Sequence, residues 1–307
     1  MKKNFHYIEF SRPNASVLKL LKALDKNKNN VSTILSNKSF KHYVEACKKK
    51  LKHGKLGVVL RFNYKNKSFS PNTIIDVTKA VSLILGKKIV QNEKGDKLVY
   101  VFDRDRNLSI NSGGRYHQTR EGGSIHTDNV NLKIKWDYLI LSCVSKAEIG
   151  GETILVNGKE IYKILKRKFK LALSILQKNF YWEKRGISES FYKSPIIEFN
   201  KKKEPTFRYL RPYMISAHEK VKKPLSPLQL YSLDVLDSLL EAPENQIRFN
   251  LSPGDILLTI DNQVLHGRTS FSDFYNSEEI FKNKKTLAPL KRTMIRAWIK
   301  DSATQRI

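Results

Sequence analysis

Residues 251–271 read LSPGDILLTIDNQVLHGRTSF and contain one of the clearest strand patterns in the chain. The turn signal SPGD precedes the apolar run DILLTI, which is typical of a buried strand, and His266 follows shortly after it. Two further residues with metal-ligand chemistry, His126 and Asp128, lie far upstream in the segment GGSIHTDN. Two imidazoles and one carboxylate can bind one face of a metal and leave the opposite face open, the arrangement found in non-heme Fe(II) oxygenases.

The spacing of His126 and Asp128 is weak evidence by itself. Seven histidines and 29 acidic residues in 307 positions make a chance His-x-Asp/Glu match an ordinary event. On an extended segment, residues two apart project to the same side, so both side chains can face one metal while Thr127 points away. Gly122 and Gly123 allow a sharp turn just before them. The alternative is a surface loop in which the histidine and the aspartate make ordinary hydrogen bonds.

The rest of the chain predicts strands around these residues and helices outside them. From Tyr138 onward, short strands alternate with turns, and the best candidates are DYLILSCV, the run within GGETILVN, and DILLTI. Two β-rich runs also flank a Gly-Asp turn within residues 89–103. Helical spacing of apolar residues predicts helices at 16–24, 74–85, 161–176 and 227–240, with Asn14 as a cap of the first and Gly86 as a stop for the second.

Length and composition favour one large soluble domain. A chain of 307 residues with 40% hydrophobic content can bury a sizeable core. We expect a single domain over 1–307, with a helical part at about 1–110 that carries no recognised motif. Cys47 and Cys143 are too few for a disulfide framework, which favours a reducing compartment. The N-terminus lacks an apolar signal region, and no stretch approaches the roughly 18 apolar residues of a membrane span, so we expect a cytoplasmic protein.

The charge balance leaves two interpretations open. The chain has 57 basic and 29 acidic residues, a formal net charge of +28. Such an excess can indicate a nucleic acid or another anionic partner. However, the lysines occur in many short runs interleaved with asparagine, which favours solvated faces of biased composition. The aromatic residues are scattered, without the spacing of a base-stacking platform, so no motif supports a nucleic-acid partner.

Taken together, four segments between about 113 and 301 resemble the taurine dioxygenase and clavaminate synthase (TauD/TfdA) superfamily of Fe(II)/2-oxoglutarate-dependent oxygenases. GGSIHTDN and residues 251–271 resemble the family's metal-ligand segments, and the resemblance assigns His126, Asp128 and His266 as the catalytic metal ligands. GGETILVN resembles a segment in which a threonine, here Thr153, contacts 2-oxoglutarate.

The fourth segment, KRTMIRAWIKD at 291–301, resembles the family's closing strand, whose first arginine grips the distal carboxylate of 2-oxoglutarate; that residue is Arg292. Alternation along a strand places Arg292 and Arg296 on one face, and buried arginines need anions. A planar guanidinium suits a carboxylate, so one arginine is expected on 2-oxoglutarate and the other on a substrate anion or an internal acid. The alternative is a solvated edge strand. Arg268 is a rival for the role of Arg292, because residues 274–289 lengthen this part of the chain and read as a polar surface insertion.

The resemblance implies a mixed α+β fold with a mainly β core: a double-stranded β-helix, or jelly-roll, with flanking helices and the metal at one open end. It also implies Fe(II) with 2-oxoglutarate and O₂ as cosubstrates, and hydroxylation of an unactivated C–H bond coupled to formation of succinate and CO₂. Asp128 favours hydroxylation, since related halogenases lack this carboxylate. Desaturation, epoxidation and cyclisation remain open.

The expected substrate is a small molecule, such as an amino acid or an anionic or carrier-tethered metabolite. The candidate substrate residues are Arg296, Arg115, Arg120 and Arg208. His117 and His218 are expected to be surface or packing residues. Two alternatives stay open: the same iron chemistry on a nucleic acid or other polyanion, and a non-catalytic binding protein on the same fold.

Overall fold

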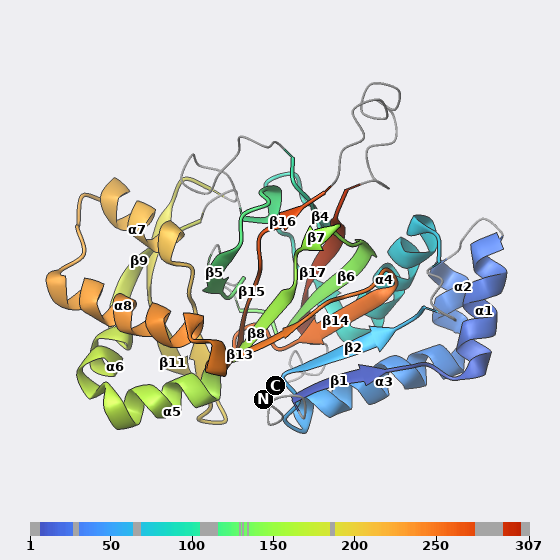
Figure 1. Ribbon diagram of the computed structural model, residues 1–307, viewed down its shortest axis with the longest axis horizontal. Helices are drawn as coiled ribbons and strands as arrows, with labels where there is room; N and C mark the ends of the chain where they lie inside the picture. The colour runs from blue at the N-terminus through green and yellow to red at the C-terminus, as the bar shows by residue number, and fades with distance from the viewer. Residues whose placement is uncertain are drawn as a thin grey trace.

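Two β-sheets form the centre of the protein (Figure 1). The computed structural model describes residues 7–26, 31–63, 69–104, 116–128, 130, 132–133, 135–184, 188–273 and 291–301. Within them, the larger sheet has the order β1-β2-β14-β6-β17-β3, with β4 also paired to β17, and the smaller has the order β13-β8-β15-β5. The β1–β2 pair is parallel, and the other pairs of these two sheets are antiparallel.

The strands of the larger sheet are β1 (Ile8–Ser11), β2 (Gly57–Arg61), β3 (Gly86–Lys88), β4 (Val99–Val101), β6 (Tyr138–Ser145), β14 (Asp255–Thr259) and β17 (Thr293–Asp301). Those of the smaller sheet are β5 (Gly123–His126), β8 (Thr153–Asn157), β13 (Gln246–Phe249) and β15 (Val264–Arg268). Short two-stranded pairs are formed by β7 (Ile149–Gly150) with β16 (Phe271–Ser272), β9 (Asn179–Glu183) with β10 (Phe191–Pro195), and β11 (Ile197–Phe199) with β12 (Pro205–Phe207).

The two sheets face each other across a shared apolar core. Leu257 of β14 and Met294 of β17 pack there with Leu155 of β8 and Val264 of β15. Neighbouring residues on the same strands point the other way, because side chains alternate along a strand. Two β-sheets packed face to face match the predicted double-stranded β-helix. The expected mixed fold with a mainly β core is confirmed.

Helices cover the outer faces of the sheets. On the larger sheet, Ile256 and Leu258 of β14 pack against helices α1 (Ala15–Lys26), α2 (Val31–Ser36), α3 (Lys38–Lys52) and α4 (Pro71–Leu85). On the smaller sheet, Ile154 and Val156 of β8 belong to a second cluster with α5 (Gly158–Lys168), α6 (Lys170–Leu176), α7 (Arg211–Lys220) and α8 (Pro227–Glu241). Figure 1 shows the two helical groups on opposite sides of the sheets. No helix in the described ranges is long and apolar enough to cross a membrane.

Local signals place most of the predicted helices correctly. The Asn14 side chain accepts a hydrogen bond from the Val17 N–H at 3.1 Å at the start of α1, and Gly86 follows the last residue of α4. The predicted stretch 161–176 is two helices, because the chain leaves helical geometry at Phe169 (φ −132°, ψ 52°). Of the two β-rich runs within 89–103, only the second forms a strand, β4.

The N-terminal part is less purely helical than expected. It supplies α1 to α4, but also β1 to β4, which join the larger sheet. Helix α3 was not predicted, although its buried residues Phe40, Val44, Cys47 and Leu51 follow helical spacing. The lysines around them, in CKKKLKHGK, obscure that apolar stripe.

Candidate metal centre

Neighbouring strands bring the two predicted histidine ligands together. His126 ends β5 and is paired in register with His266 of β15, and their ring centroids are 4.5 Å apart. Strand β15 also pairs with β8, where Arg268 lies opposite Thr153. The smaller sheet therefore holds both histidines and Thr153 at fixed positions relative to one another.

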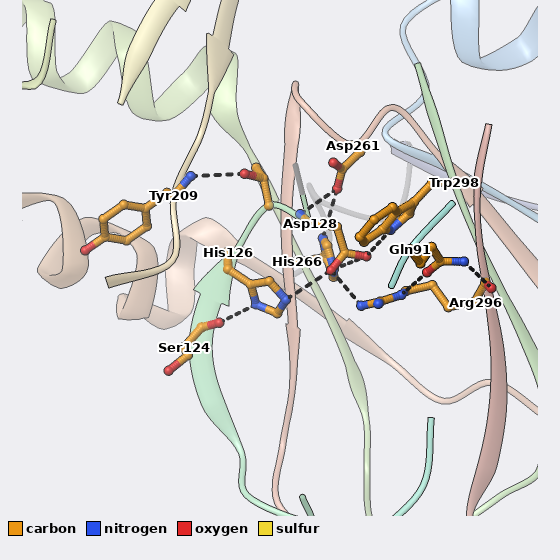
Figure 2. A network of polar contacts seen from close by, with 10 residues as sticks. Gln91, Ser124, His126, Asp128, Tyr209, Asp261, His266, Arg296 and Trp298 are labelled. Atoms are coloured by element: carbon orange, nitrogen blue, oxygen red, sulfur yellow. Dashed lines mark hydrogen bonds and ion pairs between the residues drawn. The ribbon is translucent and has the colours of Figure 1, made fainter. Parts of the chain in front are cut away.

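Asp128 completes the group from the segment just after β5. Its Oδ1 lies 3.8 Å from His126 Nε2 and its Oδ2 lies 4.0 Å from His266 Nε2 (Figure 2). Thr127 is directed elsewhere, as the alternation predicts: its N–H donates to the Tyr209 carbonyl at 2.9 Å, and its hydroxyl accepts from the Tyr209 N–H at 3.0 Å. One ligand atom from each of the three predicted residues lies within 4.8 Å of the others, so together they could hold a metal ion.

The protonation states fit metal binding. Burial alone would raise the pKa of Asp128, but the charge of Arg296 and the neighbouring histidines lower it to about 2. Burial, reinforced by His126, lowers the pKa of His266 to about 3, and burial also lowers the pKa of His126. At neutral pH, the site thus holds two neutral imidazoles and one ionised carboxylate, which are the forms that coordinate metals. This donor set is the one that non-heme Fe(II) oxygenases use.

Hydrogen bonds orient these groups. His126 Nδ1 lies 2.6 Å from the Ser124 carbonyl, which fixes a proton on Nδ1 and leaves the Nε2 lone pair directed toward Asp128. The Asp128 N–H donates to Asp261 Oδ1 at 2.9 Å, and the same oxygen lies 3.8 Å from His266 Nδ1. Asp261 is fully buried and was not predicted as a site residue, although it lies in the stretch 251–271.

A cavity connects the three candidate ligands to the residues predicted to bind 2-oxoglutarate. Its volume is about 50 Å³, and its lining residues are Val101, His117, His126, Asp128, Leu139, Leu141, Thr153, His266, Gly267, Arg268, Arg292, Met294 and Arg296. A second cavity of about 380 Å³ shares Thr153, Arg292 and Met294 with the first. Gly151 makes room for Arg292, because a Cβ at this position would lie 2.8 Å from Arg292 Nε. Its φ of +73° also favours glycine there.

The predicted substrate arginines separate into different environments. Arg296 lines the cavity and donates to Asp128 Oδ1 at 3.0 Å. Arg208 is buried and donates to the Leu132 carbonyl at 2.7 Å and to the Tyr192 hydroxyl at 2.6 Å, so it ties together protein segments. The Arg120 carbonyl accepts from the Phe271 N–H. Arg115 lies outside the described residues, as does the insertion 274–289.

His117 and Arg268, the rival candidate to Arg292, also line the cavity. His117, predicted to be a surface or packing residue, lies on the short helix η2 (Tyr116–Gln118), where it is buried and also lines the cavity. Arg268 donates to the Thr119 carbonyl just after this helix, and its guanidinium lies 5.3 Å from the Phe271 ring. His218 does pack: its Nε2 accepts from the Tyr181 N–H, and its Nδ1 bonds the Lys223 carbonyl.

The two buried histidines predict an acid sensitivity of the metal-free protein. The pKa of both is lower in the folded protein than the value of about 6.5 expected on unfolding, so the unfolded chain binds protons first as the pH falls. The free energy of unfolding is then expected to drop as the pH falls below about 6.5, with His266 contributing up to about 1.4 kcal/mol per pH unit and His126 acting in the same direction. Urea titrations in EDTA between pH 7 and 5 measure this slope, and His266→Asn should make it shallower. An unchanged slope in that variant would contradict the assignment of a neutral, buried His266.

Comparison with known proteins identifies the family. The model of the family described as taurine catabolism dioxygenase TauD, TfdA family, matches residues 58–298. The chain is similar to FR-33289 synthase of Streptomyces rubellomurinus, with 25% identity over 234 residues, covering 75% of this chain and 67% of that protein. It is also 26% identical over 208 residues to the taurine hydroxylase-like protein SAT17 of Stachybotrys chartarum, covering 65% of this chain and 52% of that protein.

Solved structures agree with this fold. Asparagine oxygenase in complex with Fe(II), a 3-hydroxyasparagine and succinate is similar with a TM-score of 0.63 and 12% identity, covering 96% of this chain and 93% of that one. The non-heme iron oxygenase OrfP in complex with Fe, succinate and (3S)-hydroxy-L-Arg is similar with a TM-score of 0.64 and 12% identity, covering 96% and 95%. Because the family model spans most of the chain, this protein belongs to the TauD/TfdA family of Fe(II)/2-oxoglutarate-dependent dioxygenases.

Proposed function

We propose that the protein hydroxylates an amino-acid-like small molecule, holding Fe(II) with His126, Asp128 and His266 and 2-oxoglutarate with Thr153 and Arg292. The observation that carries the proposal is the convergence of the three ligand atoms within 4.8 Å of one another, beside a cavity that reaches Thr153 and Arg292. The complete set of ligands argues against a non-catalytic binding protein. The presence of the Asp128 carboxylate favours hydroxylation over halogenation.

When bound, iron with 2-oxoglutarate and O₂ supplies the oxidising chemistry that hydroxylates a C–H bond, while 2-oxoglutarate becomes succinate and CO₂. The protein's own part is to bind and orient. Arg292 offers a planar pair of donors to the distal carboxylate of 2-oxoglutarate, and the Thr153 hydroxyl can add a third. The apolar side chains of Val101, Leu141 and Met294 line the same cavity and limit the access of water.

The charge of the cavity favours a substrate that carries an anionic group. Three arginines, Arg268, Arg292 and Arg296, line it together with the single carboxylate of Asp128. A divalent iron adds further positive charge, and the two carboxylates of 2-oxoglutarate offset only part of it. A carboxylate on the substrate would offset part of the remaining positive charge, since buried charges are stable only when paired.

Burial of the site favours a small substrate over a polymer. His126, Asp128 and Arg292 are each only 4–6% exposed, so a reacting group must enter a recess to reach them. A duplex or folded polyanion presents its backbone on a broad surface and contacts exposed lysines and arginines instead. The groups that carry the proposed chemistry are therefore accessible to a metabolite or to a single extended side chain.

Substrate-dependent succinate formation tests the proposed function. The protein is incubated with Fe(II), ascorbate, 2-oxoglutarate and single candidates, beginning with asparagine, arginine and taurine, and the product is identified by mass spectrometry. The expected result is succinate in excess of the substrate-free rate, with a product 16 mass units heavier, as one inserted oxygen atom requires. Iron binding with no stimulation by any anionic or amino-acid candidate, but stimulation by single-stranded nucleic acid, would overturn the choice of substrate class.

His117 is expected to contact the substrate. It lines the cavity with the metal ligands, on a segment that Arg268 holds through the Thr119 carbonyl. His117→Ala should raise the KM for substrate by about 3- to 10-fold, the size of one lost hydrogen bond, and leave 2-oxoglutarate affinity unchanged. His218→Ala removes another buried histidine and is the matched control, expected to lower thermal stability without changing KM. Equal KM values for His117→Ala and wild type would contradict the assignment.

A further inference from the structure

The Asp128 carboxylate is held at both oxygens by two different kinds of donor. Arg296 Nη1 donates to Oδ1 at 3.0 Å, and the indole Nε1–H of Trp298 donates to Oδ2 at 2.9 Å (Figure 2). Both donors lie on β17, two residues apart, and therefore reach Asp128 from one strand. Asp128 is 6% exposed and Trp298 is 1% exposed, so these bonds are made away from bulk water.

The two donors differ in what they do to a bound cation. A guanidinium carries charge and can bind both oxygens of a carboxylate as a planar fork, which would occupy the atoms that a metal needs. An indole N–H is a neutral donor with no acceptor capacity. It can fix the rotation of the carboxylate without adding positive charge beside the metal. The Trp298 bond to Oδ2 therefore opposes rotation of Asp128 into a bidentate pair with Arg296.

Packing keeps the Trp298 ring in place. It stacks on Trp136, with ring centroids 4.1 Å apart and planes inclined by 13°, and the Arg296 guanidinium lies 4.7 Å from it. Trp136 is fully buried, and its own indole N–H has no hydrogen-bond partner among the described residues. The two tryptophans share their burial and their stack, but only the Trp298 N–H reaches Asp128.

Gln91 restrains Arg296 from the other side. Its Oε1 accepts from Arg296 Nε at 2.9 Å, and its Nε2 donates to the Arg296 and Lys97 carbonyls, each at 3.1 Å. Gln91 is 1% exposed and lies in the N-terminal part of the chain, in a segment that carries no recognised motif. Because Arg296 Nε already donates to Gln91, the edge of the guanidinium that contains Nε cannot form a two-bond pair with the Asp128 carboxylate.

We propose that Trp298 is a positioning residue that keeps Asp128 oriented for metal, with Gln91 acting on the same carboxylate through Arg296. This inference rests on the proposed function, because it takes Asp128 to be an iron ligand. In metal enzymes, removal of a group that orients a ligand typically weakens metal affinity by 10- to 100-fold. Trp298 should follow this pattern, and its effect should depend on the N–H and not on the bulk of the ring.

Two substitutions at Trp298 separate the contribution of the indole N–H from that of the bulk of the ring. Trp298→Phe keeps an aromatic ring for the stack and removes the N–H. Trp298→His keeps a ring N–H at the matching position of a five-membered ring and loses more buried volume. Trp136→Phe is the control, since it removes an indole N–H from the same stack without removing a bond to Asp128. Gln91→Met tests the contact through Arg296.

The measurement is the dissociation constant for Fe(II), titrated anaerobically in the presence of 2-oxoglutarate, together with the melting temperature of each metal-free variant. We expect Trp298→Phe to bind about 10- to 100-fold more weakly, Trp136→Phe to match wild type, and Gln91→Met to bind about 3- to 10-fold more weakly. Trp298→His should bind Fe(II) more tightly than Trp298→Phe although its melting temperature is lower.

Wild-type Fe(II) affinity in Trp298→Phe, or Fe(II) affinities of the Trp298 variants that simply follow their melting temperatures, would overturn the inference. Absence of Fe(II) binding by wild type would instead overturn the proposed function and this inference with it.

Discussion

Replacing His266 with alanine is expected to abolish stable iron binding and to lower turnover by more than about 100-fold. Loss of a group that merely orients a metal ligand costs up to about 100-fold, so loss of a ligand should cost more. His266 shares the candidate site with His126 and Asp128, whose ligand atoms lie within 4.8 Å of its own. Iron content by mass spectrometry and the rate of succinate formation measure the effect.

The fold of this variant should survive, which makes the result interpretable. The pKa of His266 is lowered to about 3, so the wild-type side chain is neutral at pH 7. Its replacement by alanine therefore does not change the net charge of the buried site. Asp128 keeps its bonds to Arg296 and Trp298. Far-ultraviolet circular dichroism should therefore match wild type. His218→Ala is again the control, since it removes a packing histidine and should retain iron. A folded His266→Ala protein that holds wild-type amounts of iron would contradict the site.

Replacing Arg292 with methionine is expected to weaken 2-oxoglutarate binding by at least about 30-fold. Truncating one partner of a buried charge pair costs about 2–5 kcal/mol, and 1.4 kcal/mol corresponds to tenfold in affinity. Arg292 is 4% exposed and lines the cavity with Thr153, and methionine preserves much of the buried stem. Anaerobic titration of the iron-loaded protein with 2-oxoglutarate gives the dissociation constant directly. Excess 2-oxoglutarate should restore most of the turnover, because the three candidate metal ligands are unchanged.

Arg268→Met provides the matching comparison, because Arg268 lines the same cavity and is the rival candidate. Arg268 donates to the Thr119 carbonyl, so its loss should disturb the segment that carries His117 and alter the KM for substrate. Its effect on 2-oxoglutarate affinity should be smaller than that of Arg292→Met. The reverse order would transfer the 2-oxoglutarate role to Arg268.

The sequence predicted the parts of the fold and the site that follow simple periodicities. The apolar run DILLTI predicts a buried strand, and β14 forms there with every residue buried. Alternation along a strand predicts Arg292 and Arg296 on one face, and both residues line the cavity. His126 and Asp128 lie two apart on one extended segment, and pairing of β5 with β15 brings His266 to them.

The residues that escaped prediction act through tertiary contacts that no local pattern encodes. Gln91 reaches Arg296 from a segment without a recognised motif, and Asp261 accepts from the Asp128 N–H across a large separation in sequence. Lysine-rich surroundings concealed the apolar stripe of α3. His117 follows a segment outside the described residues, and nothing in its sequence context distinguishes a cavity-lining histidine from a packing one.

Anaerobic addition of Fe(II) and 2-oxoglutarate to the purified protein tests the central claim most directly. A 2-oxo acid chelated to Fe(II) absorbs weakly in the visible region, so the measurement reports the metal and the cosubstrate in one site without requiring the substrate. Wild type should develop this absorption and saturate at a single equivalent of iron, and His266→Ala should not develop it. A wild-type protein that shows no such absorption, or a His266→Ala protein that retains it, would contradict an iron site built from His126, Asp128 and His266.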